Sequence, residues 1–110
     1  MISVVITNAG RRRALEMQGH AGFSQKGEPD IVCAGCSAVV YALLGWMENH
    51  PERFRTESPT RVSPGEVSLC ASGGADFQAA FETAEIGLMQ IERKYPGNVK
   101  IRLRKKLEFS

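Results

Sequence analysis

The sequence predicts one α+β domain over residues 1–110, in which a mostly antiparallel sheet of four to five strands is covered by two long helices. Two observations predict this fold class. Apolar and polar residues alternate with period two near both ends of the chain and again around residues 66–72, as in half-buried strands. Between these segments lie two long stretches with helical patterning, and short turn-forming sequences join several of the elements.

The first two elements are predicted to form a hairpin. Ile2 to Thr7 alternates as a strand with one buried face, and Asn8-Ala9-Gly10 has the composition of a turn. Arg12 to His20 should therefore return antiparallel to the first strand, with His20 on the same face as its polar residues. A polar loop, Ala21 to Pro29, follows.

The next segment predicts a long helix. Asp30 offers a carboxylate as N-cap, and Ile31 to Asn49 is apolar on nearly all sides, which is typical of a central helix buried on most of its surface. Pro51 ends this helix. Residues 51–64 are the least patterned part of the chain, with one short strand expected around Phe54 to Thr56.

The last third predicts a strand, a helix and a final strand. Glu66 to Ser72 alternates as a strand, and Val99 to Leu103 does so again with basic residues between the apolar ones. The helix between them ends at Tyr95-Pro96-Gly97. Its apolar stripe consists of Phe77, Phe81, Ala84, Leu88, Ile91 and Tyr95.

Composition limits the classes of function. Hydrophobic residues make up 43% of the chain, and the net charge of +2 is too small to imply nucleic-acid binding by itself. Residues 1–7 lack the features of a signal peptide, and no apolar stretch is expected to span a membrane. The three cysteines are therefore expected to be free thiols in a reducing cytoplasm.

A histidine and a cysteine stand out because each has a distinctive setting. His20 lies in Gly19-His20-Ala21-Gly22 at a strand end, and Cys33 lies in the first turn of the long helix. Free N–H groups and the macrodipole at a helix N-terminus favour a thiolate, and they can also receive an oxyanion. A nearby imidazole would serve as base and acid. The pair is interpreted as a thiol nucleophile with its partner. By themselves, such a cysteine is more often a small buried core residue and such a histidine a structural residue at a strand end.

The sequence resembles the bacterial ribosomal-processing cysteine protease family, Prp, in the segments around His20 and Cys33 and in the glycine-containing loop between them. The resemblance continues in Glu82-Thr83, Gly87-Leu88 and Tyr95-Pro96. The resemblance implies a small homodimeric α+β protease without cofactor or metal. It would remove a short N-terminal extension from a large-subunit ribosomal protein through a Cys–His dyad. Carried onto this chain, Cys33 is the nucleophile and His20 its base. Cys36 departs from the pattern, because a small apolar residue such as alanine is expected there.

Further residues are candidates for supporting roles. Asp30 is expected mainly to cap the helix, with the orientation of His20 as a second role, and Ser37 lies one turn beyond Cys33. The loop from Ala21 to Pro29 is predicted to be mobile and to close over substrate. Its candidate substrate-contacting residues are Gly22, Phe23 and Gly27.

Two other functions remain open from the residues alone. Cys33-Ala34-Gly35-Cys36 is a C-x-x-C at a helix start, which is typical of thiol redox proteins. A zinc site that adds His20 and Cys70 to these cysteines is poorly spaced. A non-enzymatic RNA or ribosome-assembly factor would use the basic residues near both termini, if the first and last strands are neighbours. These residues are Arg11, Arg12, Arg13, Lys100, Arg102, Arg104, Lys105 and Lys106.

Overall fold

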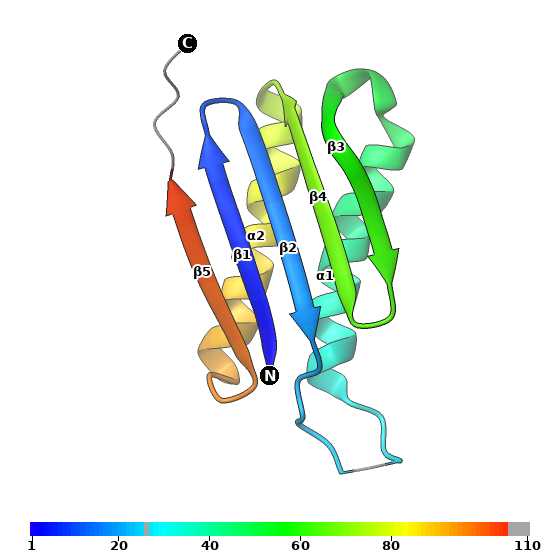
Figure 1. The fold of residues 1–110 in the computed structure, drawn as a ribbon, viewed down its shortest axis with the longest axis vertical. Coiled ribbons are helices and arrows are strands. Elements are labelled where there is room, and N and C mark those ends of the chain that lie inside the picture. Colours follow the sequence, from blue (N-terminus) through cyan, green and yellow to red (C-terminus); the bar gives the residue numbers. More distant parts are fainter. Residues whose placement is uncertain (26, 106–110) are drawn as a thin grey trace.

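The computed structural model describes residues 1–25 and 27–105, and in them two long helices and a five-stranded sheet form an α+β fold (Figure 1). This confirms the predicted fold class. In chain order the elements are β1 (Ile2–Ala9), β2 (Arg12–Gly19), α1 (Ile31–Asn49), a 3-10 turn (Pro51–Arg53), β3 (Phe54–Ser63), β4 (Glu66–Gly73), α2 (Ala75–Lys94) and β5 (Val99–Lys105).

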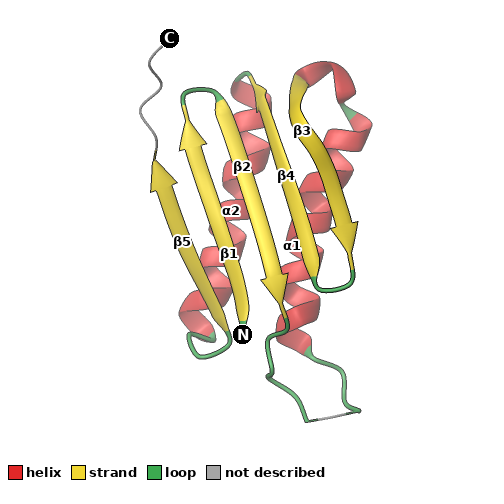
Figure 2. Ribbon diagram, viewed as in Figure 1, coloured by secondary structure: helices red, strands yellow, loops and turns green. Residues whose placement is uncertain are grey.

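The sheet has the order β3-β4-β2-β1-β5, and only the β1–β5 pair is parallel. The predicted hairpin is confirmed: Ile2 pairs with Gly19 and Ala9 with Arg12, so both strands extend almost to the turn. Both helices lie on the same face of the sheet (Figure 2), which leaves the other face uncovered.

The core fills the space between the sheet and the helices. Each inner strand contributes alternate residues, and α2 contributes the buried part of its predicted stripe. The largest fully buried side chains are Phe77, Phe81, Ile6, Leu15, Leu88, Val4, Val32, Val40 and Val99. Because Phe77 and Phe81 lie 0% and 1% exposed, the helical period predicted for α2 is confirmed by its packing.

Helix α1 is less buried than its composition predicted. Ile31 and Tyr41 are 58% and 51% exposed, whereas one row of the helix packs on the sheet. The expectation of burial on most sides is wrong because α1 lies on one face of the sheet with only α2 beside it. The helix has 19 residues and is long and apolar enough to pass for a membrane span by length and composition. Here its buried row belongs to the core: Val32, Cys36, Val40, Leu43 and Met47.

Strand β3 is longer than the short strand expected around Phe54 to Thr56. It continues to Ser63 and pairs antiparallel with β4, with register shifts between Thr56 and Ser58 and between Ser58 and Arg61. Most of its side chains are exposed, so no alternation marks it in the sequence. Pro59 is tolerated because β3 is an edge strand whose ladder is already irregular.

Candidate active site

His20 and Cys33 line one small cavity of about 80 Å³ at the end of the sheet where β2 stops and α1 begins. The structure thus brings the two candidate catalytic residues to the same site. The other residues that line the cavity are Ile2, Met17, Gly19, Ser37, Tyr41, Ser63, Gly65, Glu66 and Val67. The second turn of α1 and the β3–β4 turn therefore complete the walls.

Asp30 determines where α1 starts, as predicted. Its Oδ1 accepts hydrogen bonds from the backbone N–H groups of Val32 and Cys33, both at 3.0 Å. These bonds, the one from Cys33 above all, hold the pKa of Asp30 below its ordinary value of 3.8, although desolvation opposes them. The same contacts correct one expectation: the N–H groups of Val32 and Cys33 already serve the cap, so they are not free to receive an oxyanion.

The thiol receives a hydrogen bond from the backbone of Ala21. The Ala21 N–H donates to Cys33 Sγ with 3.1 Å between nitrogen and sulfur. Ala21 is 3% exposed, and its carbonyl accepts a 2.9 Å bond from the side-chain amide of Asn98, before β5. This backbone donor was not predicted, and the only signal for it is the short Gly-His-Ala-Gly segment where strand and loop meet.

The position of His20 depends on two glycines. Strand alternation would place His20 on the uncovered face, but Gly19 has a φ of +100°, so the alternation ends there and His20 lines the cavity. The Gly19 N–H donates to the carbonyl of Gly65 in the β3–β4 turn at 2.9 Å. A Cβ on Gly65 would lie 3.3 Å from both Cε1 and Nε2 of His20, so this turn packs directly against the imidazole.

The supporting role of Asp30 extends to the loop. Its Oδ2 accepts from the Phe23 N–H at 3.1 Å, so the carboxylate binds the helix start with one oxygen and the loop with the other. These partners are backbone groups, and none of the Asp30 hydrogen bonds in the described part of the chain goes to His20. Ser37 lines the cavity one helical turn after Cys33, as its spacing predicted.

The loop residues turn the chain and anchor it. Gly22 and Gly27 both have positive φ, at 66° and 91°. The Phe23 ring packs edge-on against Tyr95 at the end of α2, with 5.2 Å between ring centroids, so it contacts the protein's own surface. Lys26 lies outside the described residues. Whether the loop moves on substrate binding stays a prediction.

The remaining cysteines do not join Cys33 in a common site. Cys36 is 0% exposed, and burial, followed by the nearby charges of Cys33 and Asp30, raises its pKa to about 11. Cys36 therefore packs as a small core residue, and the redox alternative is left to the test of the two cysteine variants. Cys70 lines a hollow with Val5 and Thr7, next to the edge charges of β5, and not the cavity of Cys33.

The basic residues lie along a sheet edge and near a turn. Strand β5 is an edge strand beside β1, so its alternating Lys100, Arg102 and Arg104 follow an open sheet edge, where charges oppose unwanted strand pairing. Near the first turn, Arg11 Nε donates to the carbonyl of Gly73 at 3.2 Å and Arg12 pairs with Glu57 at 3.9 Å. Lys106 lies outside the described residues.

Comparison with known proteins identifies the family to which this site corresponds. A family model described as cysteine protease Prp matches residues 1–100. The ribosomal processing cysteine protease Prp of Mycoplasma genitalium is 30% identical over 87 residues, which cover 79% of this chain and 84% of that protein. The protein of the same name from Staphylococcus aureus is 25% identical over 104 residues, or 91% and 94% of the two chains.

Solved structures agree with the fold. The crystal structure of the essential ribosomal processing protease Prp from S. aureus with a covalently linked product peptide has a TM-score of 0.78 at 28% identity. It covers 96% of this chain and 100% of that one. The crystal structure of SMU.848 from Streptococcus mutans has a TM-score of 0.74 at 20% identity and covers 96% of both chains, which shows the shared fold.

Proposed function

The chain belongs to the Prp family of cysteine proteases, and we propose that its nucleophile is Cys33 and its general base His20. The observation that carries this assignment is the cavity that both side chains line, with the Ala21 N–H directed at the sulfur. Cys33 is half-buried and His20 exposed, so a peptide can reach both. The site needs neither metal nor cofactor for this chemistry.

The two residues divide the reaction as in other thiol proteases. His20 removes the proton from Cys33, and the thiolate attacks the carbonyl carbon of the scissile peptide bond. His20 then gives that proton to the leaving amine as the C–N bond breaks, which leaves an acyl group on the sulfur as a thioester. Water, deprotonated by His20, attacks the thioester and releases the new carboxyl terminus and the free thiol.

The oxyanion of each tetrahedral intermediate needs a hydrogen-bond donor beside the sulfur that can turn from its resting partner to the new charge. Since Val32 and Cys33 donate to Asp30, the Ala21 N–H is the backbone donor we assign to this task. It bonds the sulfur in the resting enzyme, and an oxyanion formed beside that sulfur lies within its reach. Its position is supported by the bond from Asn98 to the Ala21 carbonyl.

The substrate we propose is a ribosomal protein of the large subunit that carries a short N-terminal extension. Two curated relatives are named ribosomal processing proteases, and the S. aureus structures hold product and substrate peptides. Removal of an extension requires one cut in an extended segment, which suits a small site at the surface end of the sheet. We also propose, from the family resemblance, that the protein acts as a homodimer in the cytoplasm, which sedimentation analysis and cell fractionation would test.

A comparison of two cysteines one turn apart tests the assignment. Cys33→Ala should abolish cleavage of the extended ribosomal protein while the unfolding midpoint stays near that of the wild type. Cys36→Ala is the matched control, because it removes the other thiol of the C-x-x-C: most activity should remain, with a stability loss of about 1 kcal/mol from a small core cavity. Retained cleavage by Cys33→Ala would overturn the nucleophile assignment, and equal loss in both variants would favour a redox function.

A further inference from the structure

A second hollow, which the proposed chemistry does not use, lies beside the catalytic cavity. It has a volume of about 420 Å³ and lies between helix α1 and edge strand β3. Its lining is largely apolar and includes two threonines and one glutamate. The residues are Leu44, Met47, Glu48, Pro51, Phe54, Thr56, Thr60 and Val62. We refer to these residues as the α1–β3 groove.

The groove adjoins the catalytic cavity along both of its walls. On the helix side, Tyr41 lines the cavity and Leu44, three residues later on the same flank, lines the groove. On the strand side, Ser63 lines the cavity and its neighbour Val62 lines the groove. The two hollows share no lining residue, and they adjoin where Tyr41 is followed by Leu44 on the helix and Val62 by Ser63 on the strand.

Helix spacing shows why this flank is continuous. Residues three or four apart lie on one side of a helix, and Cys33, Ser37 and Tyr41 are followed at that spacing by Leu44 and Glu48. The buried row of α1 lies beside this flank and packs on the sheet. This side of α1 therefore runs in line from Cys33 in the catalytic cavity to Glu48 in the groove.

The distance along this side of α1 matches the length of a short peptide segment. At a rise of about 1.5 Å per residue, Leu44 lies about 16 Å and Glu48 about 22 Å along the helix from Cys33. An extended peptide covers about 3.3 Å per residue, so five to seven of its residues span roughly the same distance. The groove is thus positioned for side chains at some remove from the scissile bond.

The shape of β3 favours recognition of side chains over added strand pairing. The strand's ladder with β4 shifts register twice, and Pro59 within it lacks an N–H donor, so its outer edge is a poor template for a new strand. By contrast, Val62 is 52% exposed, and the groove offers it together with Leu44 and Phe54 as an apolar surface.

We propose that the α1–β3 groove is a specificity subsite that binds apolar side chains of the substrate about five to seven residues from the scissile bond. The proposal rests on the proposed function, because its occupant is the peptide cut at Cys33. It makes cleavage depend on the sequence of the removed extension or of the segment after the cut, and not only on the residues at the bond.

Two lysine substitutions test the groove. Thr60→Lys places a cation on the groove, and Thr83→Lys is the matched control: it places the same charge on the separate apolar groove between α1 and α2, and both threonines are exposed. The probes are synthetic peptides that span the cleavage site of the ribosomal precursor. In these peptides each apolar residue three to eight positions before or after the cut is replaced in turn by lysine or aspartate.

Thr60→Lys should lower kcat/KM for the apolar peptide by about tenfold, mainly through KM, whereas Thr83→Lys should leave it near the wild-type value. An aspartate at the contacted position should restore cleavage by Thr60→Lys alone. Val62→Asp is a second variant with an exposed position, and it should prefer the lysine peptide at the same place.

Each contrary result has a distinct meaning. If the wild type cleaves the peptides and Thr60→Lys matches it for all of them, the subsite is absent. If Thr60→Lys lowers cleavage of every peptide equally and also changes the sedimentation of the protein, a second copy of the chain occupies the groove and the proposal is wrong. If the wild type cleaves none of the peptides, it is the proposed function that fails.

Discussion

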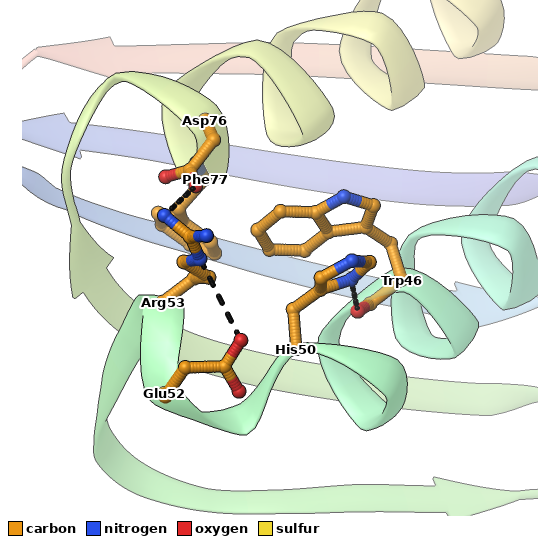
Figure 3. A network of polar contacts seen from close by, with 6 residues as sticks. All are labelled: Trp46, His50, Glu52, Arg53, Asp76 and Phe77. Atoms are coloured by element: carbon orange, nitrogen blue, oxygen red, sulfur yellow. Dashed lines mark hydrogen bonds and ion pairs between the residues drawn. The ribbon is translucent and has the colours of Figure 1, made fainter.

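The two ends of helix α1 are built from the same kind of element but are stabilised in different ways. At the N-terminal end, one carboxylate, Asp30, binds the helix start and the adjoining loop through backbone N–H groups. At the C-terminal end, the Trp46–Phe77 ring contact and an ion pair from Arg53 in the following 3-10 turn to Asp76 join this end to α2 (Figure 3). The first end carries the thiol, and the second end carries no group that we assign to catalysis.

The C-terminal end is closed by side chains that contact one another. The His50 ring stacks on Trp46 with 4.7 Å between centroids, and its Nδ1 lies 2.9 Å from the Trp46 carbonyl oxygen. Arg53 then pairs with Asp76 in the first turn of α2 at 3.3 Å (Figure 3). Phe77, next to Asp76, continues the aromatic contacts into the core.

The difference shows how one helix can contribute to both stability and chemistry. At the C-terminal end the hydrogen-bonding groups are satisfied by nearby residues, and the side chains pack against a second helix. The N-terminal end leaves a sulfur, an imidazole and one backbone N–H around a cavity, and it relies on glycines for their placement. Substitutions at the N-terminal end should therefore change rates, and substitutions at the C-terminal end should change stability.

The largest effect expected beyond loss of the nucleophile is at His20. His20→Ala should lower kcat by about 10²–10⁴-fold, since this is the usual contribution of a general acid–base group. KM should change far less. Steady-state kinetics with the precursor peptide would measure both constants, and a change confined to KM would mean that His20 only contacts substrate.

A smaller loss is expected from Gly65, which touches no substrate in our assignment but lies against the imidazole. Gly65→Ala puts a methyl group 3.3 Å from two ring atoms of His20, and a displaced base typically lowers the rate by about 10- to 100-fold. Gly65 has a φ of +74°, so alanine there also costs about 1 kcal/mol of stability.

Gly10→Ala separates these two effects. Gly10 has a φ of +59° in the β1–β2 turn, so alanine causes similar backbone strain far from the imidazole. It should lower stability by about 1 kcal/mol and leave kcat unchanged. If both glycine variants lose the same activity, general destabilisation explains the loss and the contact with His20 is irrelevant.

The sequence predicted the fold well wherever one face of an element is buried. Strand β1 and helix α2 show clear periods because their buried residues recur every second or every third to fourth position. Strand β3 was underestimated because almost all its side chains are exposed, so its formation depends on pairing with β4 and not on its own pattern. The burial of helix α1 was overestimated, because its composition does not reveal that one of its faces is exposed.

The residues of the candidate site could be predicted where their side-chain chemistry and their spacing in the sequence indicate a role. Asp30 and Cys33 follow from the capping pattern at the start of an apolar helix. The turn of His20 into the cavity depends on the φ of Gly19, and the donor to the sulfur is a backbone atom of Ala21. Neither has a side-chain signal. The contact between Gly65 and His20 joins segments far apart in the chain, so only the structure shows it.

Asp30→Asn should lower the rate moderately and should also change how the stability depends on pH. Asparagine caps helices about as well as aspartate, but its side-chain nitrogen cannot accept from the Phe23 N–H. The loop should loosen, and the rate should fall by about a few-fold, less than for a displaced base, because His20 itself keeps its position. Amide exchange at residues 21–25 with and without a non-cleavable peptide would show whether the loop becomes less protected.

The pH dependence of stability checks the same contacts. Because the pKa of Asp30 is lowered in the folded protein, its contribution to stability is present above the ordinary value of 3.8 and is lost as the pH falls through the lower folded value. Urea unfolding from pH 6 to pH 3 should therefore show a steeper loss for the wild type than for Asp30→Asn. Parallel curves would mean that the carboxylate gains nothing from its three N–H donors.

The smallest effect on rate is expected at the other end of the helix, where the comparison is sharpest. His50→Ala removes the ring that stacks on Trp46 and the Nδ1–H that donates to the Trp46 carbonyl, so stability should fall by about 1 kcal/mol or somewhat more. His50→Phe keeps a stacked ring without the donor and should recover part of this loss. Because Trp46 and His50 lie about four helical turns from Cys33, neither variant should change kcat/KM once the folded fraction is equal. A lowered kcat in both variants, with normal unfolding midpoints, would mean that the two ends of α1 are coupled. The separation of catalysis at one end from stability at the other would then be wrong.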